Sequence, residues 1–215
     1  MTIADSHTGR RLTARGAKTR ARIVAAAADL MYVQGVGDTT LDDVLAASGV
    51  SKSQLYHHFD GKESLVRAVI DHVGERVIER ERDTLGRVST IPGLRRWRDT
   101  LVQNNALRHG AYGCALGTLA SEVADQDELA RQALSRLFGE WQGLLAGVLR
   151  RLQDKGALPA EAPIDQLATG LMAALQGGYM LAQTARDVTA MATSVDMALA
   201  YIESLSAGRA NVEGR

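Results

Sequence analysis

The sequence predicts an all-α protein, and three observations support this. Ala, Leu, Arg, Glu and Gln recur throughout the 215 residues, whereas runs rich in the strand formers Val, Ile, Tyr and Thr are missing. Apolar residues repeat at helical spacing along most of the chain, and glycines end several of these periodic segments. The composition, 46% hydrophobic and 23% charged, is that of an ordinary folded domain with a buried core.

The first helix is expected to follow a polar arm. Residues 1–15 are poor in large apolar groups, so we interpret them as a flexible basic arm. The helical pattern begins at Gly16, and Gly35 ends it as a C-cap. Its inward face is formed by Ile23, Val24, Ala27, Leu30 and Met31.

Two short helices are expected next. Thr40 begins the first and pairs with Asp43 three residues later, in a variant of the capping box. Residues 48–50, Ser-Gly-Val, break this helix after about two turns. Ser51 then begins another helix, and Ser51 with Gln54 fits the S-x-x-Q capping box.

The second short helix has an apolar anchor and a clear end. Leu55 and Phe59, four residues apart, face inward, and Gly61 stops the helix. Three short helices with a tight glycine-containing turn between the last two form a helix-turn-helix unit, here at residues 16–61.

The rest of the chain predicts longer helices and a second domain. A connecting helix opens at Lys62 and covers residues 62–85. A C-terminal helical domain follows at residues 86–206, and a polar tail at 207–215. The helices expected within this domain begin at Pro92 and cover about residues 92–107, 114–123, 128–155, 164–184 and 188–206.

The charge distribution and the cysteine usage bound the possible functions. The formal net charge is zero, so the whole chain does not indicate a nucleic-acid partner. Locally, six basic residues occur with no acidic residue between them, namely Arg10, Arg11, Arg15, Lys18, Arg20 and Arg22. Cys114 is the only cysteine, and no apolar run is long enough for a signal peptide or a membrane span. We therefore expect a cytoplasmic protein without an internal disulfide.

Residues 39–65 carry the most specific motif. They contain the string G-V-S-x-x-x-L-Y-x-H-F-x-x-K-x-x-L, which closely resembles the DNA-binding domain of the TetR family of bacterial transcriptional regulators. The resemblance is strong over residues 17–75 and looser beyond. Residues 113–117, Gly-Cys-Ala-Leu-Gly, resemble one branch of the family's ligand-binding domains. This resemblance implies a homodimer that binds double-stranded DNA and responds to a small-molecule effector.

The helix from Ser51 to His58 is the expected recognition element. It is too short to be stable alone, so packing through Leu55 and Phe59 must hold it, which leaves a polar face outward. Such a face offers donors and acceptors to base edges and phosphates. By resemblance, Lys52, Ser53 and Gln54 read bases, and the phosphate contacts come from Thr40, Tyr56, His57 and Lys62. The backbone N–H groups ahead of Thr40 are expected to add an anion site.

Some features argue for plainer roles or depart from the family. Tyr56 packing over its own helix and Lys62 as a solvated lysine are the alternatives. His57 and His58 point about 100° apart on a helix and have no third ligand at helical spacing, so we expect no metal and no cofactor. Leu45 stands where the family usually has Ala, and Asp42 adds a charge that repels phosphates near its helix.

The C-terminal domain is expected to hold the effector. The candidate lining is apolar with a few polar groups that orient a ligand, namely Trp97, Tyr112, Cys114, Trp141, Met172, Gln176, Tyr179 and Met180. Plain core packing is the alternative for each, least comfortably for Gln176 and Tyr179, whose polar ends need partners. A redox role for Cys114 is a further alternative, which we rank below a place in the pocket wall.

The last two helices are expected to form the dimer interface. Apolar stripes run along both, and glycines inside a helix cost stability unless close packing repays it. The stripes consist of Leu167, Leu171, Ala174, Gly178 and Leu181 on one helix and Met191, Val195, Leu199, Ile202 and Leu205 on the other.

These observations favour a ligand-responsive repressor that acts as a homodimer on a palindromic operator. An architectural DNA-binding protein without an effector is the alternative. An enzyme is less favoured, because no nucleophile–base pair, carboxylate pair or phosphate-binding glycine loop occurs at a workable spacing.

Overall fold

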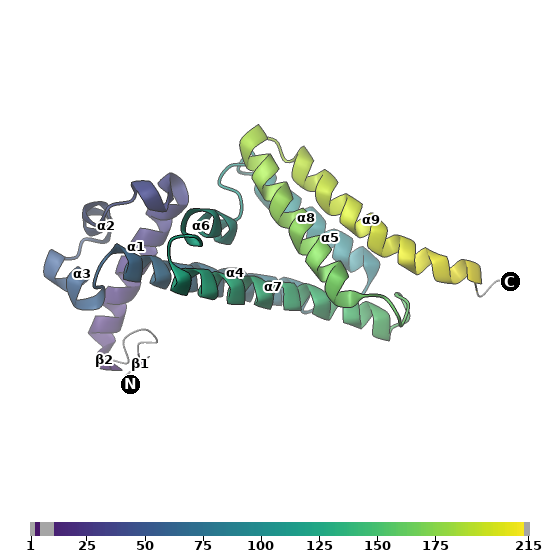
Figure 1. Cartoon of the computed structure of the whole chain (residues 1–215), viewed down its shortest axis with the longest axis horizontal. Helices are drawn as coiled ribbons and strands as arrows, with labels where there is room; N and C mark the ends of the chain where they lie inside the picture. The colour runs from purple at the N-terminus through teal and green to yellow at the C-terminus, as the bar shows by residue number, and fades with distance from the viewer. Residues whose placement is uncertain (1–2, 5–10, 213–215) are drawn as a thin grey trace. The chain divides into compact units, whose positions relative to one another are not determined.

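A computed structural model describes residues 3–4 and 11–212, and almost all of them are helical (Figure 1). The all-α prediction is therefore confirmed. Residues Ile3–Ala4 (β1) and Arg11–Leu12 (β2) pair as antiparallel two-residue strands. The helices are α1 (Ala14–Asp38), α2 (Leu41–Ser48), α3 (Lys52–His58), α4 (Lys62–Leu85), α5 (Ile91–Ala106), α6 (Ala115–Val123), α7 (Glu128–Asp154), α8 (Ile164–Ala185) and α9 (Thr189–Val212).

The chain divides into two compact units. The N-terminal unit comprises residues 1–75 and 118–134, and the C-terminal unit comprises residues 76–117 and 135–215. The boundaries fall inside α4, α6 and α7, so none of these helices belongs to one unit alone. Residues 118–134 join the N-terminal unit because Glu122 binds the end of α1 and Asp127 pairs with Arg67 of α4 at 2.6 Å.

The core of the N-terminal unit is formed by α1 to α4. Ile23 of α1, Val44 of α2, Leu55 of α3 and Leu65 of α4 are all fully buried. This shared core holds α3, whose seven residues could not sustain a helix alone. The expectation that Leu55 and Phe59 anchor α3 is confirmed, because Phe59 is buried as well.

Helix α1 is broken where the sequence predicted. Gly35 has a φ of 88°, in the left-handed region that favours glycine, and a last helical segment continues to Asp38. At the other end α1 begins at Ala14, because the Thr13 side chain accepts from Gly16 N. Of the basic arm predicted for residues 1–15, residues 1–2 and 5–10 lie outside the described part.

The C-terminal unit packs α8 against α9. A Cβ built at Gly178 of α8 would lie 2.5 Å from Ser194 Oγ and 2.9 Å from Met191 Cα, so the glycine allows the two helices to approach closely. Ser194 Oγ also donates to the backbone oxygen of Ala174 at 2.9 Å. The close packing of α8 against α9 therefore offsets the cost in helix stability of having glycine at position 178.

The two apolar stripes lie mostly within the chain rather than at an open face. Leu167 and Leu171 are buried, and so are Met191, Val195, Leu199 and Ile202. Only Leu181, 50% exposed, points outward. The stripes stabilise the packing inside the C-terminal unit and do not offer an open face to a second copy. The last helix also continues to Val212, beyond the expected end at 206, and residues 213–215 lie outside the description.

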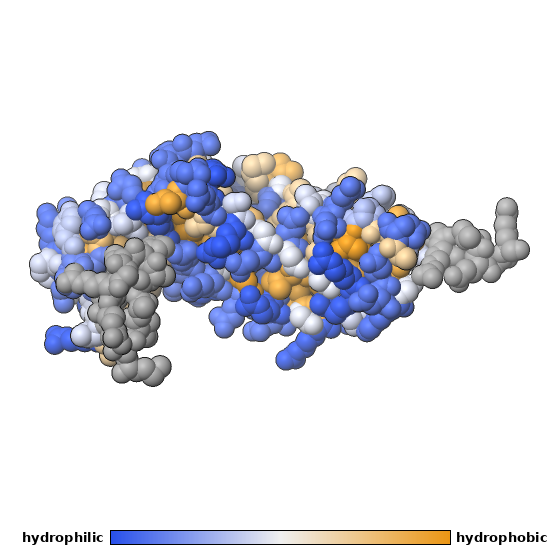
Figure 2. Space-filling model, turned by 60° about the horizontal axis from the view of Figure 1, so that its bottom comes forward, coloured by the Kyte–Doolittle hydropathy of each residue, from blue (hydrophilic) through white to orange (hydrophobic). Residues whose placement is uncertain are grey.

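The surface follows the usual separation of polar and apolar residues. The face shown in Figure 2 is mostly hydrophilic, with apolar residues confined to separate patches. Within residues 3–4 and 11–212, none of the helices combines the length and apolar character that crossing a bilayer requires.

Candidate functional site

The outward face of α3 is polar and accessible. Lys52, Ser53, Gln54 and His57 are exposed, and Tyr56 is 47% exposed. The structure therefore brings together all five residues of α3 that the sequence assigned to this face. Tyr56 does not pack over its helix as buried core.

The N-terminus of α3 is capped by its own side chains. Gln54 N donates to Ser51 Oγ at 3.3 Å, and Ser51 N donates to Gln54 Oε1 at 2.9 Å, which completes the predicted capping box. Ser53 Oγ lies 3.2 Å from Ser51 Oγ. Because Gln54 Oε1 serves the cap, the Gln54 amide nitrogen is the atom left for another partner.

The N-terminus of α2 is capped in the same way. Thr40 N and Thr40 Oγ1 donate to Asp43 Oδ2 at 2.9 and 2.6 Å, and Asp43 N donates to Thr40 Oγ1 at 3.1 Å. The bonds from the Thr40 hydroxyl and amide lower the pKa of the Asp43 carboxyl. Thr40 is thus engaged with a carboxylate of its own helix.

Amides near the end of α1 are satisfied by a carboxylate of α6. Val36 N and Gly37 N donate to Glu122 Oε2 at 2.7 and 3.2 Å. The Thr40 amide is likewise held by a carboxylate, that of Asp43. The helix-terminus anion site expected at Thr40 concerns the first amides of α2 and stays a prediction.

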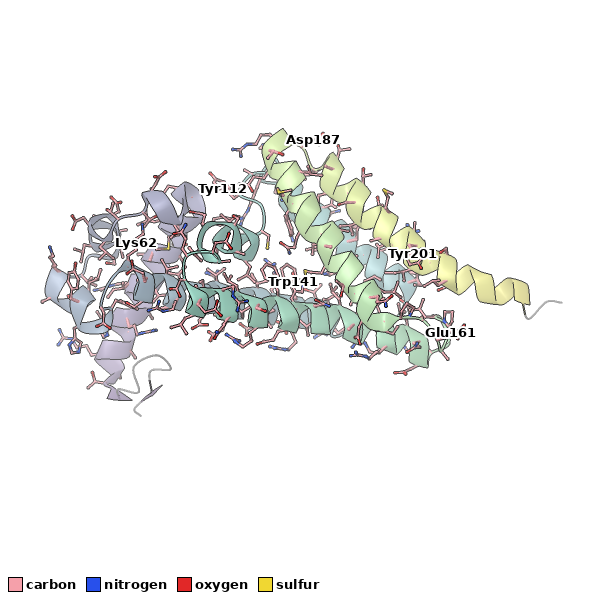
Figure 3. All side chains as sticks on the ribbon, viewed as in Figure 1. Lys62, Tyr112, Trp141, Glu161, Asp187 and Tyr201 are labelled. Carbon is pink, nitrogen blue, oxygen red and sulfur yellow. The ribbon has the colours of Figure 1, made fainter. Side chains whose placement is uncertain are left out.

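Lys62 has a structural partner. Its Nζ donates to the backbone oxygen of Gly37 at 3.0 Å and so joins the start of α4, where Figure 3 labels Lys62, to the last segment of α1. An ammonium group has three donors, so this bond leaves two for a phosphate. The phosphate contact assigned to Lys62 stays a prediction.

Aromatic and basic groups support α3 from within its own unit. The His57 and His58 rings lie edge to face with centroids 5.1 Å apart, and the His58 ring lies 6.4 Å from that of Phe59. The guanidinium of Arg20 lies 5.2 Å over the Phe59 ring. Among the described residues, no group of His, Cys, Asp and Glu is arranged to hold a metal ion.

In the C-terminal unit, Trp97 is tied to a buried acid. Trp97 Nε1 donates to Glu81 Oε2 at 3.0 Å, and Glu81 is 2% exposed. The other oxygen of Glu81 accepts from Arg80 Nε and Nη2 at 3.2 and 3.0 Å. The indole N–H of Trp97 is therefore already used inside the protein.

Cys114, Met172 and Gln176 lie together. Gln176 Nε2 donates to Met172 Sδ at 3.6 Å, and Gln176 also hydrogen bonds Cys114. A Cβ at Gly117 would lie 3.0 Å from Gln176 Oε1. Burial raises the pKa of the Cys114 thiol, so the thiol stays protonated and is a poor nucleophile. This environment argues against the redox role.

Trp141 and Asn105 carry buried polar atoms without partners. Among the residues that the structure describes, Trp141 Nε1 has no acceptor and Asn105 Oδ1 has no donor. Trp141 is 0% exposed and Asn105 is 5% exposed. Unpartnered buried groups are uncommon in folded proteins and indicate a strained or functional position.

The remaining predicted lining residues lie in more open places. Tyr112 is 38% exposed in the loop before α6 and has a φ of 67° (Figure 3). Tyr179 is half-buried on α8, whereas Met180 is 62% exposed. Met180 therefore lies apart from the Met172–Gln176 pair, because its side of α8 faces solvent.

Sequence reasoning missed two residues that organise these sites. Glu122 fills the amide site at the end of α1, 86 positions away in the sequence, and no local pattern marks it. The position of Glu81, in contrast, could have been noticed in the sequence. Val77, Ile78 and Leu85 share its helix face, so an acid at position 81 interrupts an apolar stripe.

The fold and the exposed face of α3 define a helix-turn-helix transcriptional regulator, and the comparisons with known proteins agree. Residues 23–69 match the family model described as bacterial regulatory proteins, tetR family, and residues 91–198 match the tetracyclin repressor-like C-terminal domain. The second match covers half of the chain. The chain belongs to the TetR family of bacterial regulators.

Relatives and solved structures are similar over most of their length. An HTH-type transcriptional regulator encoded in the lacX 3′ region of Lactococcus lactis subsp. lactis is 27% identical, over 83% of this chain and 90% of its own. The HTH-type transcriptional regulator LmrA of Bacillus subtilis is 27% identical, over 80% and 89%. A crystal structure of a TetR transcriptional regulator from Chloroflexus aurantiacus superposes with a TM-score of 0.75 at 29% identity, covering 88% and 96%.

Proposed function

We propose that the chain is a ligand-responsive repressor that acts in the cytoplasm as a homodimer on a palindromic operator and is released by a small-molecule effector. The observation that carries the DNA-binding part is the exposed, capped, polar face of α3. A helix held rigidly by a buried apolar side suits the major groove, where side chains at its N-terminal half reach base edges.

Gln54 has a restricted role in this proposal. Because its Oε1 accepts from Ser51 N, only the Nε2 donor is left to bond DNA unless the cap opens. A bidentate contact to adenine needs both atoms, whereas a single donor suits an acceptor such as guanine N7 or O6. We expect Gln54→Ala to relax preference at one operator position, with a smaller effect on affinity for random DNA.

The test of DNA binding uses selection from random duplexes, followed by titrations at several salt concentrations. If both residues contact phosphates, Tyr56→Phe and Lys62→Ala should each weaken binding across sequences, and Lys62→Ala should also lower the slope of log affinity against log salt by about one unit. Lys155→Ala is the matched control, because Lys155 lies in the C-terminal unit and bonds Ser89 at 2.7 Å. Unchanged affinity and slope in both variants would contradict the assignment.

The dimer is proposed through the open faces of α8 and α9. Met180, Leu181, Met197 and Tyr201 are 62%, 50%, 70% and 59% exposed. A Cβ added at Gly177 meets no atom within 4 Å, so the packing inside this chain does not require a glycine there. An exposed apolar face with an unneeded helical glycine is what a close helix contact with a second copy would use.

Sedimentation tests the dimer. The chain should sediment at about twice the mass of one chain, and Gly177→Leu should shift it toward monomer without unfolding it. Gly139→Leu is the control, because Gly139 is also a helical glycine with open space around its Cβ. Equal behaviour of the two variants would exclude this face as the interface.

The effector response is proposed for the C-terminal unit. The buried, incompletely satisfied polar atoms of Trp141 and the sulfur-bonded amide of Gln176 support it. An effector that binds the DNA-free state better than the operator-bound state shifts the equilibrium and releases DNA. An architectural DNA-binding protein would instead keep its operator affinity in the presence of every compound that binds the C-terminal unit.

A further inference from the structure

Trp141 presents a hydrogen-bond donor that the protein does not use. Its indole N–H is fully buried, and within the described part of the chain it has no acceptor. An indole nitrogen can only donate, so an acceptor atom is what this position lacks. The indole N–H of the other tryptophan, Trp97, donates a hydrogen bond to Glu81 Oε2 at 3.0 Å.

A second donor of the C-terminal unit, the Gln176 amide, is bonded to sulfur. Gln142 Nε2, next in sequence to Trp141, donates to Thr169 Oγ1 at 2.6 Å, so this part of α7 contacts α8 about one turn before Met172. Met172 is buried, and its sulfur accepts from Gln176 Nε2, one helical turn further, at 3.6 Å. Thioether sulfur is a weak acceptor, so the Gln176 amide would gain by bonding oxygen.

The buried acidic residue of the C-terminal unit, Glu81, already has hydrogen-bond partners for its carboxylate. Of the acidic residues that the structure describes, Glu81 is the one that is buried, and both of its oxygens accept hydrogen bonds, one from Trp97 and one from the Arg80 guanidinium. A cation entering the C-terminal unit would therefore find no unpaired buried carboxylate, and its desolvation would be uncompensated.

We propose that the effector is an uncharged molecule with an apolar body and an acceptor oxygen, which binds beside Trp141 and Gln176 and accepts hydrogen bonds from both. The inference rests on the proposed effector response and narrows its chemistry to carbonyl, ether or hydroxyl compounds rather than cations. Buried Met172 and Cys114 supply an apolar, polarizable wall beside Gln176.

The experiment compares probes that differ only in the polar group. Calorimetric titrations of the full chain use naphthyl methyl ketone, ethylnaphthalene and naphthylethylammonium, and the same three groups on a biphenyl and on an undecyl skeleton. The ketone of a skeleton that fits should bind about tenfold more tightly than its hydrocarbon, which corresponds to one good neutral hydrogen bond. The ammonium compound should bind more weakly than either.

Nuclear magnetic resonance identifies the donor, because the chain has 2 tryptophans and hence two indole N–H signals. The ketone should move the Trp141 N–H downfield and leave that of Trp97 in place. Trp141→Phe should reduce the ketone to the affinity of the hydrocarbon, and Gln176→Met should do so in part. Trp97→Phe is the control that keeps the preference.

Three results would overturn the inference: equal binding of ketone and hydrocarbon, tightest binding of the ammonium compound, or no binding by any skeleton. The proposed repressor function is scored separately, by release of labelled operator DNA. A compound that releases the operator without needing Trp141 leaves that function standing. A ketone that binds as expected yet never releases DNA contradicts the effector response alone.

Discussion

The helix ends of the N-terminal unit and two buried side chains of the C-terminal unit differ in how their polar groups are satisfied. In the N-terminal unit, helix ends and loop amides are partnered by nearby or incoming side chains, as Ser51, Asp43 and Glu122 show. In the C-terminal unit, Trp141 Nε1 and Asn105 Oδ1 are buried without partners. This difference fits the proposed function, in which a DNA-binding surface gains from rigidity before DNA arrives and an effector site leaves polar groups for a ligand to satisfy.

The largest expected effect is the difference in unfolding free energy between the Trp97→Phe and Trp141→Phe variants. Trp97→Phe removes the donor to buried Glu81, whereas Trp141→Phe removes an N–H that has no acceptor. Both lose the same volume, so the difference in unfolding free energy reports the hydrogen bond to the carboxylate, about 1.5–3 kcal/mol. Urea denaturation of both variants measures it. Equal losses would mean that Trp141 has a partner and would break the comparison.

The next effect concerns Glu122. Glu122→Ala leaves the amides of Val36 and Gly37 without an acceptor, at an expected cost of about 1–3 kcal/mol in the N-terminal unit. Glu122→Gln keeps one acceptor oxygen and should cost less. Hydrogen exchange of the Val36 and Gly37 amides checks the assignment. Unchanged protection in the alanine variant would show that other groups hold this turn.

A smaller effect is expected at helix ends. Ser51→Ala removes the cap of α3 and should cost about 1 kcal/mol, with a parallel loss of DNA affinity as the helix frays. Helix α8 begins after Pro163 with no side-chain cap, so Pro163→Ala provides the contrast and should change stability less. Thermal denaturation followed by circular dichroism compares them. A larger loss for Pro163→Ala would reverse the distinction between the units.

The smallest effect is the pH dependence of the Asp43 cap. The folded-state pKa of Asp43 is lowered by its bonds from Thr40, so this stabilisation is present above the unfolded carboxyl pKa and is lost as the pH falls through the folded value. Asp43→Asn should therefore melt earlier than the parent chain at neutral pH, and the gap should close below about pH 4. Asp42→Asn, outside the capping box, is the control. A gap independent of pH would rule out this origin.

Local chemistry explains why so much of the N-terminal unit could be predicted. The Thr40 and Ser51 boxes, and the glycines at 35 and 49, act within four residues, so their patterns are visible in the sequence. The contacts that could not be predicted join distant segments, as Lys62 does with the backbone of Gly37. Such pairs depend on how helices pack, which no short spacing encodes.

The C-terminal unit shows a second limit of prediction from the sequence. Helical periodicity identified apolar stripes on α8 and α9, but periodicity cannot say whether a stripe faces the same chain or another one. Packing assigned Leu171 and Val195 to the interior and left Met180 and Met197 exposed. In the same way, composition marked both tryptophans as unusual, and only the structure separated the one that is hydrogen bonded from the one that is not.

The burial of Cys114 makes the chain convenient for spectroscopic distance measurements. It is the only cysteine, and its thiol is buried and protonated, so maleimide or nitroxide reagents should react far faster with a thiol introduced at an exposed site. In the proposed homodimer, Ser53→Cys would place one label on helix α3 of each copy without removing the native cysteine. Pulsed electron resonance between the two labels would then report, as a distribution of distances, whether the two α3 helices move apart when the proposed effector is added.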